Sequence, residues 1–194
     1  TGADPTLTAG GAVTFTEGNG TDDTLVLADL KDLTITTASA NANITLPNID
    51  GTSGDGNDGT DLTILAGTGN VSVKSIDTDI NDLRIDGTTI TLTGDITTAA
   101  HNPGSADAAS IDINGAAVIG AGITVTSGNG TVDFSGAVNS DSGENRALTI
   151  VSGSGAAAIN GTVGANDALG NLTINAAGTG AITLSTVGAD AAAG

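Results

Sequence analysis

One segment of sixteen residues recurs along the chain and limits its fold more than any other feature. It runs from Leu148 to Val163 with the sequence LTIVSGSGAAAINGTV. Residues Ile123 to Val138 match it without a gap: branched apolar residues flank a threonine, Gly-x-Gly follows, and a valine closes the unit. Leu172 to Val187 is a third copy with one extra residue, and Leu62 to Val73 is a shorter fourth. A motif that recurs every couple of dozen residues is typical of a solenoid.

The spacing of the copies predicts the length of one coil. The last copies begin 25 and 24 residues apart, so about 24 residues per coil would give roughly eight coils. Ile111 and Ile123 begin similar strands but are too close for a whole coil, so we expect them on different faces of one turn. Within the strands, apolar residues alternate with Thr, Ser and Asp, which predicts one buried and one exposed face.

The composition predicts a thin core without aromatic bulk. The 194 residues include two Phe and no Tyr, Trp, Met or Cys, so stacked Leu, Ile, Val and Ala must fill the interior. The 30 glycines fall in short clusters between strand-like runs, with no collagen period. The sequence predicts an all-β solenoid. Because the spacing is irregular, a Greek-key β-sandwich of a surface-layer or pilus subunit is the alternative.

Three regions are expected along the chain. Residues 1–32 form a degenerate copy of the unit, which predicts an N-terminal capping or joining repeat. Residues 33–188 carry the solenoid repeats, interrupted by polar loops near 50–61 and 98–110. Residues 189–194 form a short C-terminal tail.

The charge excludes several classes of partner. The formal net charge is −18, and the only positive residues are Lys31, Lys74, Arg84 and Arg146. Nucleic acid and anionic membranes are therefore not expected as partners, and no apolar run is long enough to insert into a bilayer. The absence of cysteine argues against disulfides and thiol chemistry. It fits an extracellular protein that relies on repetition for stability.

The cadence Leu-Thr-Ile, Gly-x-Gly and Val-x-Phe-x-Gly-x-Val over residues 33–188 resembles the repeats of large secreted bacterial surface proteins. These are the filamentous-haemagglutinin-like and autotransporter-type proteins and the giant adhesins built of β-strand repeats. The resemblance implies a right-handed parallel β-helix at the cell surface. It rests on the cadence alone and carries no catalytic or binding signature.

Two acidic segments are candidate calcium sites. The segment DGNDGTDL at 55–62 resembles one nonapeptide of the calcium-binding repeats-in-toxin family, and crowded carboxylates on glycine turns suit a hard cation. Residues 17–23 resemble the same nonapeptide less closely. Those repeats bind calcium between tandem copies and only one is present here, so ordinary polar loops are the alternative. The candidate ligands are Asp55, Asn57, Asp58, Asp61, Asp22 and Asp23.

No catalytic site is predicted, and we expect no enzymatic activity. His101 is the sole histidine and stands beside Asn-Pro-Gly in a loop, with no Ser-His-acid arrangement around it. Enzymes that act on glycans from β-helices normally present aromatic and basic residues to the sugar, and this chain has almost none.

The sequence therefore predicts an extracellular structural protein, a self-assembling subunit or segment of a filament, surface layer or adhesin stalk. Stacked strands end in open edges that can template another copy head to tail, and neither end has a predicted capping helix. The expected joining surfaces are Gly2 to Val13 and Gly180 to Gly194. The alternative is an adhesin module that binds a receptor or glycan through its inserted loops.

Overall fold

The computed structural model describes residues 4–15, 24–28, 31–52, 59–77, 79–99 and 108–188 of the chain. These residues form strands and no helix, so none of them forms a helix that could cross a membrane. The strands are β1 (Thr6–Thr8), β2 (Val13–Thr14), β3 (Thr24–Leu27), β4 (Leu33–Thr36), β5 (Ile44–Gly51), β6 (Thr60–Leu65), β7 (Val71–Ile76), β8 (Ile80–Leu92), β9 (Ile96–Thr97), β10 (Ala109–Ile119), β11 (Ile123–Thr126), β12 (Asn129–Phe134), β13 (Val138–Ser140), β14 (Ala147–Gly153), β15 (Ala157–Val163), β16 (Asn171–Ala176) and β17 (Ile182–Val187).

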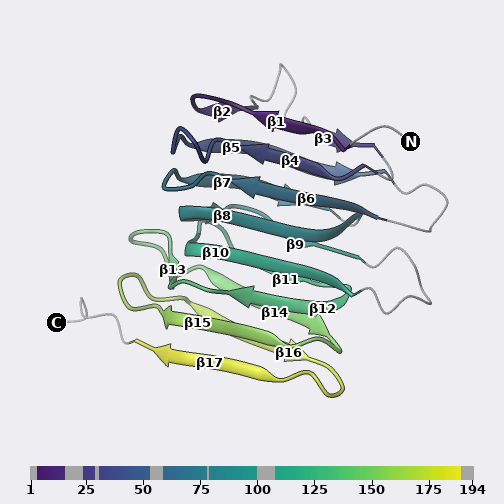
Figure 1. Cartoon of the computed structure of the whole chain (residues 1–194). Coiled ribbons are helices and arrows are strands. Elements are labelled where there is room, and N and C mark those ends of the chain that lie inside the picture. Colours follow the sequence, from purple (N-terminus) through teal and green to yellow (C-terminus); the bar gives the residue numbers. More distant parts are fainter. Residues whose placement is uncertain are drawn as a thin grey trace.

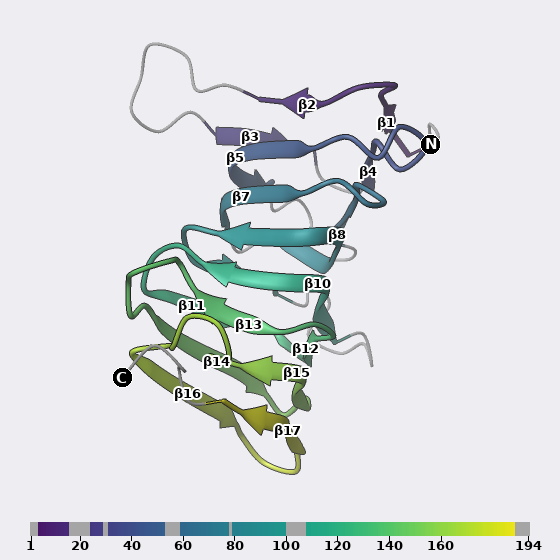
Figure 2. The same ribbon diagram turned by 90° about the vertical axis from the view of Figure 1, so that its left-hand side faces the viewer.

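The strands stack into three walls around a common core (Figures 1 and 2). The first wall runs β1, β4, β6, the first half of β8, the first half of β10, β12, and the starts of β15 and β17. The second wall runs β2, the starts of β5 and β7, the second halves of β8 and β10, β13, and the ends of β15 and β17. The third wall runs β3, the ends of β5 and β7, β9, β11, β14 and β16.

Every pairing between described strands is parallel, and each strand pairs with the corresponding strand one turn away. The predicted β-solenoid is therefore confirmed, and the alternative β-sandwich, which needs antiparallel sheets, is wrong. Six successive turns carry all three walls without interruption, from β4 to β16. The predicted N-terminal cap contributes β1, β2 and β3 as a further rung at one end, and β17 adds a rung at the other.

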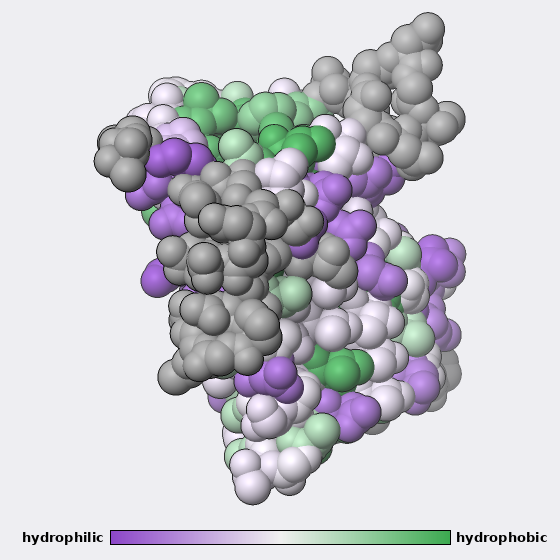
Figure 3. Space-filling model, turned by 90° about the vertical axis from the view of Figure 1, so that its right-hand side faces the viewer, coloured by the Kyte–Doolittle hydropathy of each residue, from purple (hydrophilic) through white to green (hydrophobic). Residues whose placement is uncertain are grey.

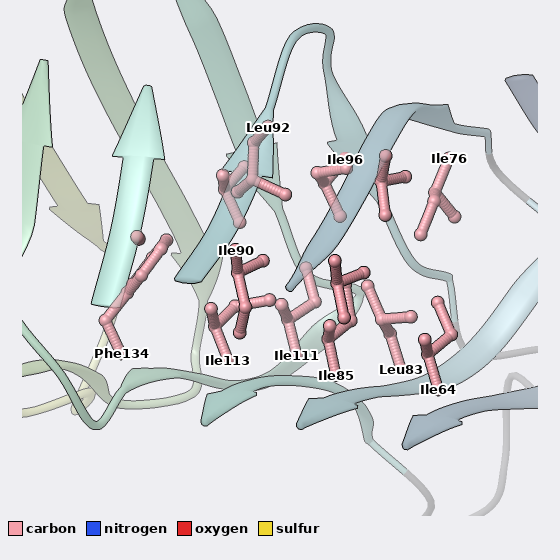
Figure 4. Packing of buried hydrophobic residues seen from close by; sticks show 14 of the residues in the cluster. Ile64, Ile76, Leu83, Ile85, Ile90, Leu92, Ile96, Ile111, Ile113 and Phe134 are labelled. Atoms are coloured by element: carbon pink, nitrogen blue, oxygen red, sulfur yellow. The ribbon is translucent and has the colours of Figure 1, made fainter. Parts of the chain in front are cut away.

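The core consists of ladders of like residues, as the alternation predicted. One ladder of the first wall runs Ile35, Ile64, Ile85, Ile113, Phe134 and Ile159, all fully buried (Figure 4). Facing ladders come from the second wall, with Ile90 and Leu92, and from the third wall, with Ile76 and Ile96. Branched aliphatic side chains stacked in register leave few gaps, so this thin interior packs well with a single buried aromatic residue.

The repeat seen in the sequence changes walls along the rod. Leu33 and Leu62 begin copies on the first wall, whereas Leu148 and Leu172 begin copies on the third wall. Ile111 and Ile123 accordingly lie on different walls of one turn, as the spacing predicted. The same unit of strand, Gly-x-Gly and strand therefore forms two different corners. In the N-terminal turns it leads from the first wall to the second. In the C-terminal turns it leads from the third wall to the first wall of the next turn.

Both kinds of corner use the same local chemistry. Asn41 and Asn129 have left-handed φ angles of 51° and 72°, and each Oδ1 accepts a backbone N–H of the next turn, from Thr68 at 3.0 Å and from Ser154 at 3.3 Å. Just before a corner of either kind, a buried hydroxyl donates to a corner carbonyl. Thr37 donates to Ala42 before the corner between the first and second walls, and Ser127 donates to Gly130 at 2.6 Å before the corner between the third and first walls. These buried polar groups are therefore satisfied within the corner itself.

Glycines stack directly on one another where the chain rounds a corner. A Cβ added to Gly155 would lie 2.0 Å from the carbonyl oxygen of Gly130, and one added to Gly180 would lie 2.1 Å from that of Gly155. A second stack, between the first and second walls, places Gly136 on Gly115 and Gly161 on Gly136 in the same way. Only residues without a Cβ allow successive turns to approach this closely.

Candidate functional site

Most of the predicted calcium ligands cannot be placed. Asp55, Asn57, Asp58, Asp22 and Asp23 lie outside the described residues, as does His101. Asp61 is described, and it lies in β6 rather than in a loop. The polar segments predicted near 50–61 and 98–110 are shorter than expected, because β5 extends to Gly51, β6 begins at Thr60 and β10 begins at Ala109.

Asp61 is one step of a ladder of aspartates that connects successive turns. Its Oδ1 accepts the backbone N–H of Asp82 at 3.0 Å and the side-chain amide of Asn81 at 3.3 Å. The backbone N–H of Asp61 donates in turn to Oδ1 of Asp32 at 3.1 Å, and Ser110 N–H donates to Oδ1 of Asp82 at 2.6 Å. Each carboxylate thus satisfies a backbone donor at the start of the next first-wall strand. The described surroundings of Asp61 assign it this structural role.

The signal for this ladder was present in the sequence but was not used. An Asp-Leu pair recurs on three successive rungs of the first wall, with Asp32 directly before β4, Asp61 near the start of β6 and Asp82 near the start of β8. Among the described residues, no group of three or more His, Cys, Asp or Glu side chains is arranged to hold a metal ion. A calcium site at the predicted loops stays a prediction.

A second polar network covers the outer face of the first wall. The Arg84 guanidinium binds both oxygens of Asp86, with Nε to Oδ1 at 3.1 Å and Nη2 to Oδ2 at 2.8 Å. The amide of Asn114 donates to Asp86 at 2.9 Å and to Asp112 at 3.0 Å. One turn further, burial and the neighbouring Asp112 raise the pKa of Asp133. Asp86 and Asp112 are thus hydrogen-bonded to side chains of the same wall.

Three aspartates have a raised pKa, which predicts a stability that rises as the pH falls. Burial is the largest cause for Asp50, Asp61 and Asp133, and nearby carboxylates add to it. Each of these carboxyl groups has a folded-state pKa above the ordinary 3.8. At a pH between the ordinary and the raised pKa, the folded chain therefore holds more protons than the unfolded chain. The stabilisation is full below about 3.8, the ordinary value, and is lost as the pH rises through the raised values.

We therefore expect the thermal midpoint, measured by far-UV circular dichroism on dilute protein, to be higher near pH 4.5 than at pH 7. Asp61→Asn keeps an acceptor oxygen but cannot titrate, so this variant should show a weaker pH dependence. A midpoint that falls steadily from pH 7 to pH 4.5 would contradict the prediction.

Two shallow recesses occur on the described surface. One, of about 350 Å³, is polar and is lined by Ser75, Ile76, Asp77, Asp95 and Thr97 on the third wall. The other, of about 290 Å³, lies beside Leu169 and Val187 near the C-terminal end.

The two ends of the solenoid are its most unusual surfaces. Large apolar side chains that are exposed gather there: Leu7 in β1, Val26 in β3, and Ile182, Leu184 and Val187 in β17. Ile182 is 52% exposed and Val187 63%, although the equivalent residues one turn earlier, Ala157 and Val163, are buried. Figure 3 shows apolar side chains gathered at the top of the molecule, the end at which β1 to β3 lie in Figure 1.

The strand edges at these ends have no partner among the described strands. β1 pairs only with β4, β16 only with β14, and β17 only with β15. Natural sheets usually protect a free edge with charged residues, proline or a covering element. Residues 168–188 contain no charged residue and no proline, in a chain with a net charge of −18. Within the described part of the chain, the C-terminal edge therefore lacks the common devices that prevent pairing with another strand.

The described strands that flank the two predicted loops meet at the same corner of the rod. Residues 53–58 and 100–107 lie outside the described residues, but β5 and β9, which precede them, end on the third wall, and β6 and β10, which follow them, begin on the first wall of the next turn. In later turns the same corner is made by short Gly-x-Gly connections, at residues 128–130 and 153–155. Both predicted loops therefore begin and end at one edge of the rod.

Comparison of the chain with protein-family models, with curated proteins and with solved structures finds no match in any of the three.

Proposed function

We propose that this protein is an extracellular structural β-solenoid, a self-assembling subunit or segment of a filament, surface layer or adhesin stalk. The observation that carries the proposal is the open C-terminal rung, where β16 and β17 present free backbone groups and exposed apolar side chains without any charge. Pairing with another strand would bury both. The resemblance to secreted bacterial repeat proteins and the absence of cysteine support a location outside the cell.

The side walls fit a structural role. Threonine, aspartate and asparagine cover them, and their side chains are largely engaged with neighbouring turns, as at Asp61 and Asn114. The strong negative charge keeps rods apart sideways, because like-charged walls repel. Assembly is thus favoured along the axis and opposed across it.

Electron microscopy of the purified chain, with calcium and then with a chelator, tests this proposal. We expect filaments or sheets built from rods about 35 Å long, the height of eight stacked rungs. Leu184→Lys places a charge in the free rung and should abolish assembly, whereas Ser154→Lys, at an exposed corner on the side of the rod, should not. Loss of filaments in chelator would support calcium at the acidic loops. A chain that stays monomeric at high concentration with calcium would overturn the proposal.

A second candidate function is an adhesin module that recognises a receptor or glycan. The observation in its favour is that the described strands flanking residues 53–58 and 100–107 meet at the same corner, so both segments begin and end at one edge of the rod. Deletion of one insertion that abolished adhesion but left assembly intact would support this candidate.

A further inference from the structure

The proposed function leaves open how two copies meet, and the following inference rests on it. At the described C-terminal end, the third wall stops one rung before the other two walls. Its last strand is β16, whereas β17 adds a further rung to the first and second walls. The next strand of the solenoid would follow Val187 onto the third wall and pair with the free edge of β16. A second copy whose β1 takes that place continues the spiral without a gap.

From the residues at both ends, we infer that a second copy of this chain docks head to tail, rotated by about a third of a turn about the rod axis. In this register, β1 of the second copy pairs with β16, and β2 pairs with the first half of β17. The alternative is an unrotated register, in which each wall of the second copy continues the same wall of the first. There β1 would pair with β17, and β3 would lie two strand spacings, about 9.6 Å, from β16. That arrangement leaves a rung of the third wall unfilled by any described strand.

The sequence of the end surfaces matches the rotated register. Within its own chain, β1 pairs with Thr34, Ile35 and Thr36 of β4, a strand that begins Leu33-Thr-Ile35. β2 pairs with Ile44 and Thr45 of β5, a strand that begins Ile44-Thr-Leu46. At the opposite end of the molecule, β16 contains Leu172-Thr-Ile174 and β17 begins Ile182-Thr-Leu184. The free edges of β1 and β2 would therefore meet strands that contain the same three residues as the starts of the strands on their other side.

The register follows residue by residue from the observed pairings. Leu7 pairs with Ile35 and Thr6 with Thr34, so in the joint Leu7 lies over Ile174 and Thr6 over Thr173. Val13 pairs with Ile44 and Thr14 with Thr45, so in the joint they lie over Ile182 and Thr183. The exposed apolar residues Leu7 and Ile182 are then buried in continuous ladders, while the threonines stay on the outside.

The charges on the described end strands do not oppose this contact. Residues 168–188 are uncharged, and β1, β2 and β3 contain no charged residue. Asp4, near the N-terminal end, is paired with Lys31 at 3.9 Å. The described end strands of two copies therefore repel each other less than the acidic side walls do.

Cysteine cross-linking tests the register, because the chain contains no cysteine of its own. Cα atoms of paired strands lie about 4.8 Å apart, within the range that a disulfide spans. The variant Thr6→Cys with Thr173→Cys, and the variant Thr14→Cys with Thr183→Cys, should form dimers and longer chains on mild oxidation. The control, Thr6→Cys with Thr183→Cys, reports the unrotated register and should stay uncross-linked. The paired positions lie at opposite ends of one molecule, so a disulfide forms only between copies.

The outcomes separate this inference from the proposed function. Cross-linking of both rotated pairs in filaments supports both. Filaments that cross-link only through Thr6→Cys with Thr183→Cys overturn the rotated register but keep the structural role. Cross-linked dimers that never extend support the joint and overturn the filament. A chain that neither assembles nor cross-links in any variant overturns the joint and the self-assembling role together.

Discussion

Replacing Gly155 by alanine is expected to lower the free energy of unfolding by about 2–4 kcal/mol, the range of severe overpacking. The new Cβ would lie 2.0 Å from the carbonyl oxygen of Gly130, so one of the two turns has to move. The backbone at Gly155 is held by its neighbours, because β15 begins two residues later at Ala157 and pairs with β17, and Gly180 lies in the same stack. Far-UV circular dichroism during urea unfolding measures the change, since the chain has no Trp or Tyr for fluorescence.

Gly122→Ala is the matched control for this substitution. Gly122 lies at a bend between two walls, has no neighbouring atom within 4 Å of an added Cβ, and has no left-handed φ angle. Alanine there should leave stability unchanged or raise it by about 0.4–1 kcal/mol through the unfolded chain. Equal effects of the two substitutions would show that the corner does not depend on close approach of the backbones.

Truncation of Phe134 to alanine is the second change with a large expected effect. Phe134 is fully buried, and its ladder neighbours are Ile113 on one side and Ile159 on the other. Removing the ring from this thin core leaves a cavity that rigid stacked turns cannot fill, so we expect a loss of about 3–5 kcal/mol. Urea unfolding followed by circular dichroism measures it.

Phe134→Leu provides the comparison for this truncation. Leucine keeps most of the apolar volume in a ladder that is otherwise isoleucine, so its cost should be clearly smaller, on the order of 1 kcal/mol. If alanine and leucine destabilised equally, the ring itself, rather than the filling of the core, would be the important property of this position.

The sequence was sufficient to predict the solenoid because its two strongest signals are local. The alternation in Leu33-Thr-Ile35 and its copies reports one buried face, and Gly-x-Gly reports a corner. It was not sufficient to assign walls. The copy at Leu62 and the copy at Leu148 look alike but lie on different walls, because a Thr or Ser hydroxyl, a left-handed residue and a stacked glycine build either corner equally well.

The candidate site was harder to predict, and Asp61 shows why. As a residue in a run of Asp and Gly it resembled a cation ligand, but its two donors, Asn81 and Asp82, come from the next turn. Turns of this chain differ in length, so a residue 21 positions away cannot be identified as a neighbour until the register is known. The joining surfaces at Gly2 to Val13 and Gly180 to Gly194 were expected because neither end has a predicted capping helix, and they stay a prediction.

Because each turn contacts only the turns before and after it, the molecule behaves as a one-dimensional array. The free energy of local opening therefore differs from turn to turn along the axis. Turns around β8 and β10, with neighbours on both sides, are held from two directions, while the alternately exposed β16 and fully exposed β17 are held from one. Amide exchange should accordingly be slowest in the middle and fastest at the C-terminal rung. Addition of another copy would convert the least protected rung into an interior one, so the rod gains cooperativity as it grows.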